Sequence, residues 1–328
     1  MNKMNVSVII PCHNESAIIS KKIENSLKLG ETIKEIIIVD DNSTDETYNI
    51  ALKLENTHKN ITVLKNTGGH GKNSAVVLAL KNCSGDIICL TDADIMLPEN
   101  TVINVLPYFD KNKVGMVSLS PMLIFPVCNK PNNEYATVYE TCVRWLKITE
   151  SWIDSVPVPH GQALFFLKHL NLLPIRQADD VDLGIQTRKK GYKVKYAKYC
   201  FFHEKVLDDS TKLRKQKIRR CKAVIDALLF HKDVLFNPKY GFFGMLCYPA
   251  DLFVYVFSPL LFILSMITFV TLLFATNHSI FAFTMLAIIS VLVIKYKSII
   301  LLTVVNFTSI WEYFKSGQKN AWRTPREL

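Results

Sequence analysis

The chain has 328 residues, of which 49% are hydrophobic, and a formal net charge of +10 at pH 7. This length allows one large domain, or a domain with an appended region, and it can bury a substantial core. The positive charge suits nucleic acid, anionic lipid or phosphorylated substrates, but no helix-turn-helix, zinc-finger or RNA-binding pattern supports nucleic acid as a partner. The eight cysteines show no metal-ligand spacing and indicate free thiols in a reducing compartment.

The first part of the chain alternates short apolar runs with helical segments. The spacing predicts helices from about residue 14 to 29, from 44 to 54 and from 74 to 81. Strand alternating with helix four times predicts an α/β fold with a mostly parallel sheet wound with helices. The strands are predicted at residues 6–10, 35–39, 61–64 and 87–90.

Polar residues follow each of these four strands. Because parallel strands end at one edge of a sheet, and ligands bind beyond those ends, we expect these residues to line one site. The glycine-rich loop after the third strand departs from the P-loop pattern, since Lys72 is followed by Asn73. The polar strand ends are Asn14 and Glu15, Asp40 and Asp41, Gly71 and Lys72, and Asp92 and Asp94.

Asp92 and Asp94 stand one residue apart at the end of the fourth strand. Side chains alternate along an extended chain, so both carboxylates are expected on one side while Ala93 points away. Two like charges so close are unfavourable unless a hard divalent cation, with positions open for phosphate oxygens, lies between them. A polar strand end followed by a turn is the alternative interpretation. The convergence of several acidic strand ends favours the metal–nucleotide site.

The middle of the chain is less regular. A helix predicted at residues 134–152 carries Trp145 and Trp152 along one side, which indicates either a membrane interface or ordinary core packing. The run of basic residues at 212–222 is interpreted as a solvated face that can also touch anionic lipid. Further strands are predicted at residues 114–119, 163–167 and 194–202.

A helix near residue 179 opens with three acids in four positions, Asp179, Asp180 and Asp182. Acids at a helix start interact favourably with the helix dipole, which is the simplest interpretation. An acid that faces a metal-bound diphosphate is also what a reaction needs to remove a proton. His203, after the last strand, fits a structural histidine better than a metal or phosphate ligand.

The carboxyl-terminal third predicts a protein of the cell membrane. Residues 252–274 carry no charge and are long enough to span the ~30 Å hydrocarbon layer. A second span is predicted at about 279–296, and residues 298–314 form either an interfacial helix or a third span, before a basic tail. No signal peptide is expected. The predicted metal–nucleotide site needs a cytosolic donor, so everything before residue 252 is expected in the cytoplasm. The positive-inside tendency of Lys295 and Lys297 favours a multi-pass arrangement in which the second span returns there.

Six motifs occur in order along the chain: the opening strand with Pro11, Asn14 and Glu15; the acidic segment at Asp40 and Asp41; Gly71-Lys72; Asp92-Ala93-Asp94; Ala178-Asp179-Asp180; and Gln216-Lys217-Ile218-Arg219-Arg220. In this order they resemble a family 2 glycosyltransferase of the membrane-attached branch near cellulose, chitin and hyaluronan synthases. The resemblance covers nearly the whole chain. It implies a GT-A nucleotide-diphospho-sugar transferase domain at residues 1–235 and a membrane region at 236–328.

The resemblance also implies a reaction and its residues. It implies an inverting, metal-dependent transfer from a nucleotide-diphosphate sugar, with UDP favoured, to a membrane-borne glycan or lipid acceptor at the bilayer. Asp180 corresponds to the catalytic base, and Asp94, with Asp92 nearby, to the ligands of Mn²⁺ or Mg²⁺. Donor-binding roles are implied for Pro11, Asn14, Glu15, Asp41, Lys72, Asp92, Gln216, Arg219 and Arg220.

Two positions depart from the family pattern: His13 stands where tyrosine is usual, and Arg220 replaces the tryptophan of the Gln-x-x-Arg-Trp motif. In processive polymerases that tryptophan helps to form the acceptor site, so we expect a nonprocessive enzyme. Two alternatives stay open. One is transfer to a polyprenyl phosphate, which scarcely needs a base. The other is a noncatalytic nucleotide-sugar-binding membrane subunit, against which the intact acidic motifs argue.

Overall fold

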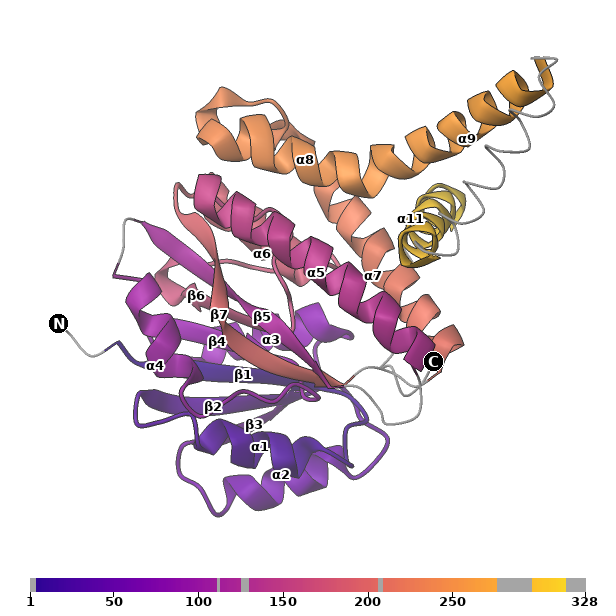
Figure 1. The fold of residues 1–328 in the computed structure, drawn as a ribbon. Coiled ribbons are helices and arrows are strands. Elements are labelled where there is room, and N and C mark those ends of the chain that lie inside the picture. Colours follow the sequence, from indigo (N-terminus) through magenta and orange to yellow (C-terminus); the bar gives the residue numbers. More distant parts are fainter. Residues whose placement is uncertain (1–3, 111–112, 125–129, 206–208, 276–296, 317–328) are drawn as a thin grey trace.

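Seven strands form one sheet in the computed structural model, which describes residues 4–110, 113–124, 130–205, 209–275 and 297–316. The strand order is β3-β2-β1-β4-β6-β5-β7 (Figure 1). All seven apolar runs predicted from the sequence form strands. They are β1 Val6–Cys12, β2 Ile33–Asp40, β3 Ile61–Lys65, β4 Ile87–Thr91, β5 Val114–Ile124, β6 Ala163–Leu167 and β7 Lys193–Lys205.

The sheet is mixed, because β6 pairs antiparallel with both of its neighbours, β4 and β5. The other six strands run in one direction, so the predicted mostly parallel sheet is confirmed except at β6. The reversal has a consequence for the site. β6 enters the sheet at the edge where β4 leaves it, with Ala163 opposite Thr91. Residues that precede β6 therefore lie beside the residues that follow β4.

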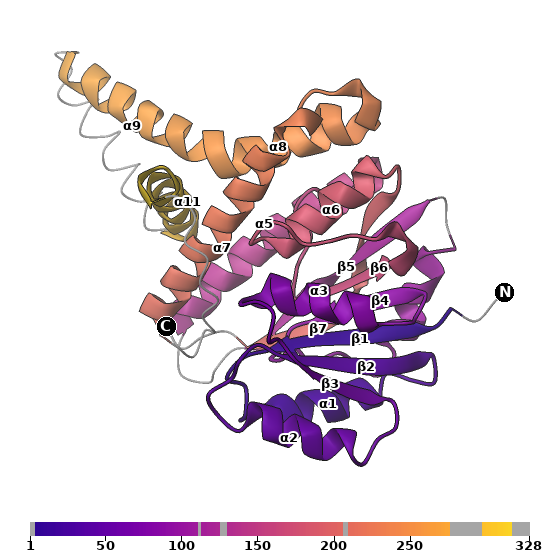
Figure 2. The ribbon, with the colours of Figure 1, turned by 180° about the vertical axis from the view of Figure 1, so that it is seen from behind.

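Helices cover both faces of the sheet (Figures 1 and 2). Alternation along β1 divides its side chains, since Val8 and Ile10 pack in one buried cluster while Ile9 packs in another. The first cluster includes residues of α1, α2 and α4, and the second includes residues of α3 and α6. The helices bounding these layers are α1 Ile19–Leu27, α2 Thr47–Glu55, α3 Lys72–Asn82, α4 Thr101–Val105 and α6 Asp179–Lys189, with the short turns η1 Leu106–Tyr108 and η2 Lys168–Leu170.

Of the remaining helices, α5 packs against β7, α7 packs against α6, and the helix that includes α8 and α9 projects away from the sheet (Figure 1). A third buried cluster joins α6 to α7 and α8 through residues such as Val181, Ala227 and Tyr248. These elements are α5 Lys130–Ile153, α7 Ser210–Phe230, η3 Lys232–Val234, η4 Pro238–Tyr240, η5 Phe243–Cys247, α8 Tyr248–Leu252, η6 Phe253–Phe257, α9 Ser258–Ala275 and α11 Lys297–Ser316.

One helix in the described part of the chain, Phe243–Phe269, is long and apolar enough to cross a membrane by length and composition. It contains most of the predicted first span at 252–274, but it begins nine residues earlier because η5 and α8 continue into it. The predicted second span at 279–296 lies wholly outside the described residues. The third segment, 298–314, forms α11, whose Ile310 packs against Cys221 and Ile225 of α7. The multi-pass arrangement stays a prediction.

The helix predicted at residues 134–152 is confirmed as α5. Trp145 is 68% exposed and Trp152 is 84% exposed, so neither indole packs in the core. The sequence left two interpretations of Trp145 and Trp152, a membrane interface or core packing. The exposure of both side chains excludes core packing.

Candidate active site

A cavity of about 940 Å³ opens at the edge of the sheet where β1, β2 and β4 end. It continues past α6 and α7 to Tyr255 and to Val305 of α11. Nine of the predicted site residues line this cavity: Pro11, Glu15, Asp41, Lys72, Asp92, Asp94, Asp180, Arg219 and Arg220. Within the described chain, Asn14 and Gln216 are not among the lining residues. The structure therefore brings together motifs that are separated by more than two hundred positions in the sequence.

Lys72 links the acidic motif after β4 to the acids at the start of α6. Its ammonium lies 2.9 Å from Oδ1 of Asp92 and 3.1 Å from Oδ2 of Asp179. Burial alone would lower the pKa of Lys72, but the carboxylates of Asp179 and Asp92 raise it above its usual range. Lys72 is therefore a permanent cation that holds two carboxylates from distant segments at one point of the cavity.

Asp94 lies in an environment that disfavours a second negative charge. Burial and the carboxylates of Asp92 and Glu204 together raise the pKa of Asp94 to about 6, with Arg220 opposing them. A bound cation would relieve this repulsion, and carboxylate oxygens are the ligands that Mg²⁺ and Mn²⁺ prefer. No cluster of three or more His, Cys, Asp or Glu side chains suited to a metal occurs among the described residues. Asp92 and Asp94 are the carboxylates that would hold such a cation, and they would leave its other positions open for phosphate oxygens.

The end of the cavity beside β1 and β2 is closely hydrogen-bonded. Oδ1 of Asp41 accepts from the Asn66 amide at 2.6 Å, and Oδ2 accepts from the Gly71 backbone N–H at 2.7 Å. Asp41 therefore fixes the glycine-rich loop against the end of β2. Asn14 joins the β1 loop to the β2 loop, since its Oδ1 accepts from the Thr44 backbone N–H at 2.8 Å.

Asp180 reaches the cavity at the start of α6, as predicted for a base. Its carboxyl group lies against the backbone of Gly161, where an added Cβ would be only 2.6 Å from Oδ2. Burial, together with the neighbouring Asp179, raises the pKa of Asp180 to about 6. A carboxylate with a raised pKa in a cavity is a suitable proton acceptor near neutral pH.

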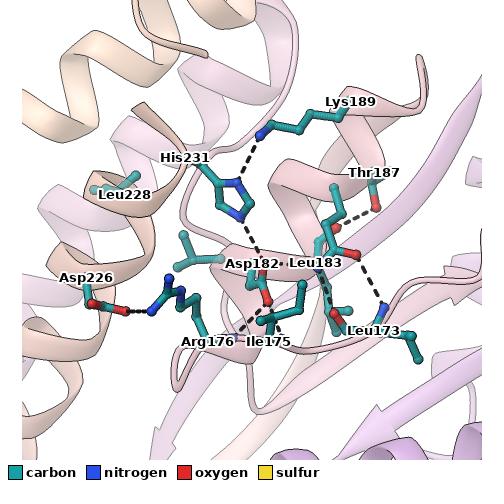
Figure 3. Close-up of polar contacts among 12 residues, drawn as sticks. Leu173, Ile175, Arg176, Asp182, Leu183, Thr187, Lys189, Asp226, Leu228 and His231 are labelled. Carbon is teal, nitrogen blue, oxygen red and sulfur yellow. Dashed lines mark hydrogen bonds and ion pairs between the residues drawn. The ribbon is translucent and has the colours of Figure 1, made fainter. Parts of the chain in front are cut away.

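The third acid, Asp182, has a structural role instead. Its Oδ2 accepts from the backbone N–H groups of Ile175 at 2.5 Å and Arg176 at 3.0 Å, while Oδ1 lies 2.8 Å from Nε2 of His231 (Figure 3). Lys189 of α6 contacts the other nitrogen of His231 at 3.0 Å. This network ties the segment before Asp180 and the start of α6 to the end of α7.

The basic motif of α7 faces the acidic motif of β4. Arg220 lies 3.3 Å from Oε1 of Glu204, and Oε2 of Glu204 accepts from Gln162 at 3.1 Å. Arg219 also lines the cavity, whereas Gln216 is buried outside its lining. His203 is joined to Met96 through backbone hydrogen bonds of 2.8 and 3.3 Å and is not part of the lining, which agrees with a structural histidine.

Sequence reasoning missed two groups of residues. Lys22 of α1 is fully buried and donates hydrogen bonds to Thr91 and to the Ile95 carbonyl, on either side of the acidic motif. The sequence did contain a signal for this burial. Lys22 shares the helical spacing of Ile19, Ile23 and Ser26, and this spacing places all four residues on the face of α1 that packs against the sheet. The second group, His160 and Gly161, enters the site because β6 is antiparallel.

The fold and this arrangement of motifs define the class of protein as a glycosyltransferase with a GT-A-like α/β domain. Residues 7–168 match the sequence model described as Glycosyl transferase family 2. The structure superposes on a mannosyltransferase from Pyrobaculum calidifontis, solved in complex with GDP-Man and Mn²⁺, with a TM-score of 0.78. The superposition covers 96% of this chain and 88% of the other at 21% sequence identity, which bears on the fold alone.

Curated relatives agree with this class. The chain is 33% identical over 118 residues to a beta-monoglucosyldiacylglycerol synthase of Nostoc sp. strain PCC 7120, covering 35% of this chain and 25% of the relative. It is 24% identical over 234 residues to a poly-beta-1,6-N-acetyl-D-glucosamine synthase of Staphylococcus aureus, covering 68% and 55%. A dolichol-phosphate mannosyltransferase of Pyrococcus furiosus is 36% identical over 102 residues, covering 30% and 28%. The chain thus spans between a quarter and about half of the length of these relatives. Residues 7–168, just under half of the chain, match glycosyl transferase family 2.

Proposed function

We propose that the protein is an inverting, metal-dependent glycosyltransferase that moves a sugar from a nucleotide-diphosphate sugar to a hydroxyl group of a membrane-associated acceptor, one sugar at a time. The observation that carries this proposal is the single cavity that contains both Asp94, for the donor diphosphate, and Asp180, for the acceptor hydroxyl. UDP-sugars are the favoured donors from the resemblance of the motifs.

The donor side of the proposal rests on charge. As the bond from the sugar to the diphosphate breaks, the leaving group gains negative charge. Asp92 and Asp94 would hold a divalent cation there, and that cation would stabilise this charge as a Lewis acid. Lys72, Arg219 and Arg220 line the same part of the cavity and add positive charge. Asp41 and Asn14 support the proposal indirectly, since they hold the loops on which a nucleotide would rest.

The acceptor side rests on Asp180 and on the apolar end of the cavity. Asp180 takes the proton of the acceptor hydroxyl as the oxygen attacks the anomeric carbon, while the bond from that carbon to the diphosphate oxygen breaks. One displacement from the opposite face inverts the anomeric configuration. The lining also includes apolar side chains of the helices outside the sheet, namely Val143, Val224, Tyr255 and Val305. Tyr255 belongs to the long apolar helix Phe243–Phe269, and this position in the lining supports an acceptor with a lipid portion.

A panel of radiolabelled nucleotide sugars, incubated with the purified chain, Mn²⁺ and native membranes, tests this proposal. We expect label from one nucleotide class to enter a lipid or glycan product with inverted configuration. If every donor in the panel stays intact, both with membranes and with water as acceptor, the proposal is wrong and the noncatalytic subunit is the better interpretation.

A second candidate, transfer to a polyprenyl phosphate, is favoured by the basic side chains of the lining. Lys147 and Lys217 lie in the cavity in addition to Arg219 and Arg220, and together they could hold a phosphate acceptor. A phosphate oxygen is already ionised, so this reaction does not need Asp180 as a base. The two candidates therefore differ in their dependence on Asp180.

A further inference from the structure

Residues 174–178 form a segment outside any helix or strand, and this entry segment leads directly into α6. All five of its residues line the cavity. Because the segment belongs to no helix or sheet, its backbone N–H and C=O groups need partners from other parts of the protein. Since α6 begins at Asp179, the position of the entry segment decides where the carboxyl group of Asp180 lies.

The entry segment is tied on one side to α6 and α7. The carboxylate of Asp182 accepts from the backbone N–H groups of Ile175 and Arg176, and the Arg176 side chain extends toward α7 (Figure 3). There its guanidinium carbon lies 3.6 Å from the centre of the Phe230 ring, and its Nη1 lies 3.6 Å from Oδ2 of Asp226. These contacts fix the segment relative to two helices. They do not fix it relative to the ends of β1, β2 and β4, which are the donor end of the cavity in the proposed function.

Asn73 makes the connection to the donor end. Its side-chain NH2 group donates to the backbone carbonyl of Arg176 at 2.6 Å, across 103 positions of the sequence. Asn73 is the second residue of α3, and the first residue, Lys72, forms the ion pair with Asp179 at 3.1 Å. Two adjacent residues of α3 therefore hold the entry segment and the first residue of α6.

The two contacts differ in what they can fix. The ammonium group of Lys72 is shared between Asp179 and Asp92, and the attraction of such a point charge depends only weakly on direction. The amide of Asn73 donates to one carbonyl, that of Arg176, and a hydrogen bond weakens steeply as its angle departs from linear. The position of the Arg176 carbonyl relative to the donor end therefore depends on Asn73 more than on Lys72.

We propose that Asn73 is a positioning residue for the base. It holds the Arg176 carbonyl, and thereby the start of α6, so that the Asp180 carboxyl group keeps its place relative to the donor end. The inference rests on the proposed glycosyltransferase function and adds a residue to it. Asn73 acts through the entry segment and not on the donor, so its loss should slow the reaction without weakening donor binding.

The test compares three variants of the purified full chain. Asn73→Leu keeps a side chain of similar size but cannot donate a hydrogen bond, whereas Asn73→Gln keeps the amide. Asn82→Leu is the matched control, because Asn82 is exposed at the other end of α3 and its amide donates to the Leu78 carbonyl of the same helix at 2.8 Å. The kcat and the KM for the donor are measured with native membranes as acceptor, both in the wild-type and in the Asp180→Asn background.

We expect Asn73→Leu to lower kcat about tenfold, the effect of one hydrogen bond that orients a reacting group, with the KM for the donor within about twofold. Asn73→Gln should recover most of the loss, and Asn82→Leu should match the wild type. In the Asp180→Asn background, Asn73→Leu should not lower the residual kcat further, because no base remains to be positioned. A residue that only stabilises the fold would not show this dependence on Asp180.

Hydrogen exchange tests the structural step without any substrate. The backbone N–H groups of residues 175–178 should exchange faster in Asn73→Leu than in the wild type, because the entry segment has lost one of its attachments. Their exchange should be unchanged in Asn82→Leu. If Asn73→Leu does not fold, Asn73→Ala removes the same hydrogen bond with a smaller side chain and takes its place in both measurements.

Three results would overturn the inference. They are an unchanged kcat or an unchanged exchange rate in Asn73→Leu, a raised KM for the donor, which would make Asn73 a donor-binding residue, and a further tenfold loss in the Asp180→Asn background. Failure of the proposed function shows itself separately, as a wild-type enzyme that consumes no donor with membranes or with water, while the exchange measurement still reports whether Asn73 holds the entry segment.

Discussion

The two ends of the cavity, one proposed to bind the donor and the other the acceptor, are built differently. At the donor end, both carboxylate oxygens of Asp41 accept hydrogen bonds from the protein, and Lys72 joins Asp92 to Asp179. The acceptor end is lined by α6 and by side chains of other helices, among them Val143, Val224 and Val305. Contacts within the protein thus fix the donor end, whereas the acceptor end carries apolar side chains from several helices.

This difference has a general reason. The donor end is assembled from the ends of adjacent parallel strands, whose backbone register fixes the loops. The acceptor end is assembled from the loop before β6 and from helices far apart in the chain. Substitutions at the donor end should therefore remove activity as a whole, and those at the acceptor end should change rate or acceptor choice while donor binding survives.

The largest effect is expected at the metal motif. Asp94→Ala should abolish both transfer and Mn²⁺-dependent donor binding, because a single remaining carboxylate holds the cation and its diphosphate poorly. Calorimetric titration with the donor nucleotide, with and without Mn²⁺, measures this. Asp86→Ala is the control, since Asp86 precedes the opposite end of the same strand. Full activity of the wild-type enzyme in excess EDTA would refute the assignment.

The next largest effect is expected at the base. Asp180→Asn keeps the shape of the side chain but cannot accept a proton, so kcat should fall by ~10²–10⁴-fold while the KM for the donor stays the same. The donor end would then be intact in a nearly inactive enzyme, which sharpens the contrast between the two ends. Wild-type turnover by this variant would favour the polyprenyl-phosphate candidate instead.

The same residue predicts a pH dependence. The pKa of Asp180 is raised to about 6, and the base acts only when it is deprotonated. Activity should therefore be full well above pH 6 and should decline as the pH falls through 6, with a slope that reports one proton. The residual activity of Asp180→Asn should lack this decline, and a decline of equal midpoint in the variant would assign it to another group.

A smaller effect is expected at Gly161, where a methyl group would displace the base. An added Cβ would lie 2.6 Å from Oδ2 of Asp180, so the carboxyl group must move while the fold stays intact. Gly161→Ala should lower kcat by about 10- to 100-fold with the KM for the donor unchanged. Gly184→Ala in the same helix as Asp180 is the matched control, since its nearest contact would be an ordinary 3.4 Å. Equal loss in both variants would indicate general destabilisation.

The sequence predicted the donor end more completely than the acceptor end. Strand alternation and the acids after β1, β2 and β4 were sufficient to place Glu15, Asp41 and Asp94 in one cavity. The antiparallel entry of β6 left no signal in a short apolar run, because such runs look alike in either direction. His160 and Gly161 therefore could not be placed. Lys22 was missed for another reason: a lysine on a helix is usually exposed, and only its apolar neighbours mark it as buried.

The smallest effect is expected from Lys22, whose ammonium group donates hydrogen bonds to Thr91 and to the Ile95 carbonyl at the donor end. Burial lowers the pKa of Lys22 from 10.5 to about 8, with the nearby carboxylates only partly offsetting this. Between pH 8 and 10.5 the unfolded chain binds more protons at this residue than the folded chain does. The contribution of Lys22 to the free energy of unfolding must therefore rise with pH across that window, by up to ~3 kcal/mol. Methionine does not titrate, so the Lys22→Met variant lacks this pH-dependent contribution.

Thermal unfolding measures the contribution of Lys22 as the difference in melting temperature between the wild type and Lys22→Met. The chain is solubilised in detergent, and EDTA is present so that no bound cation adds its own charge. The melting temperature of the wild type relative to that of Lys22→Met should increase by several degrees from pH 8 to 10. Lys21→Met, on the exposed side of the same helix, should show no such trend. A parallel response of all three proteins to pH would mean that Lys22 is not buried under the acidic motif. The organised donor end would then depend on Lys72 and Asp41 alone, because these two residues hold its loops independently of α1.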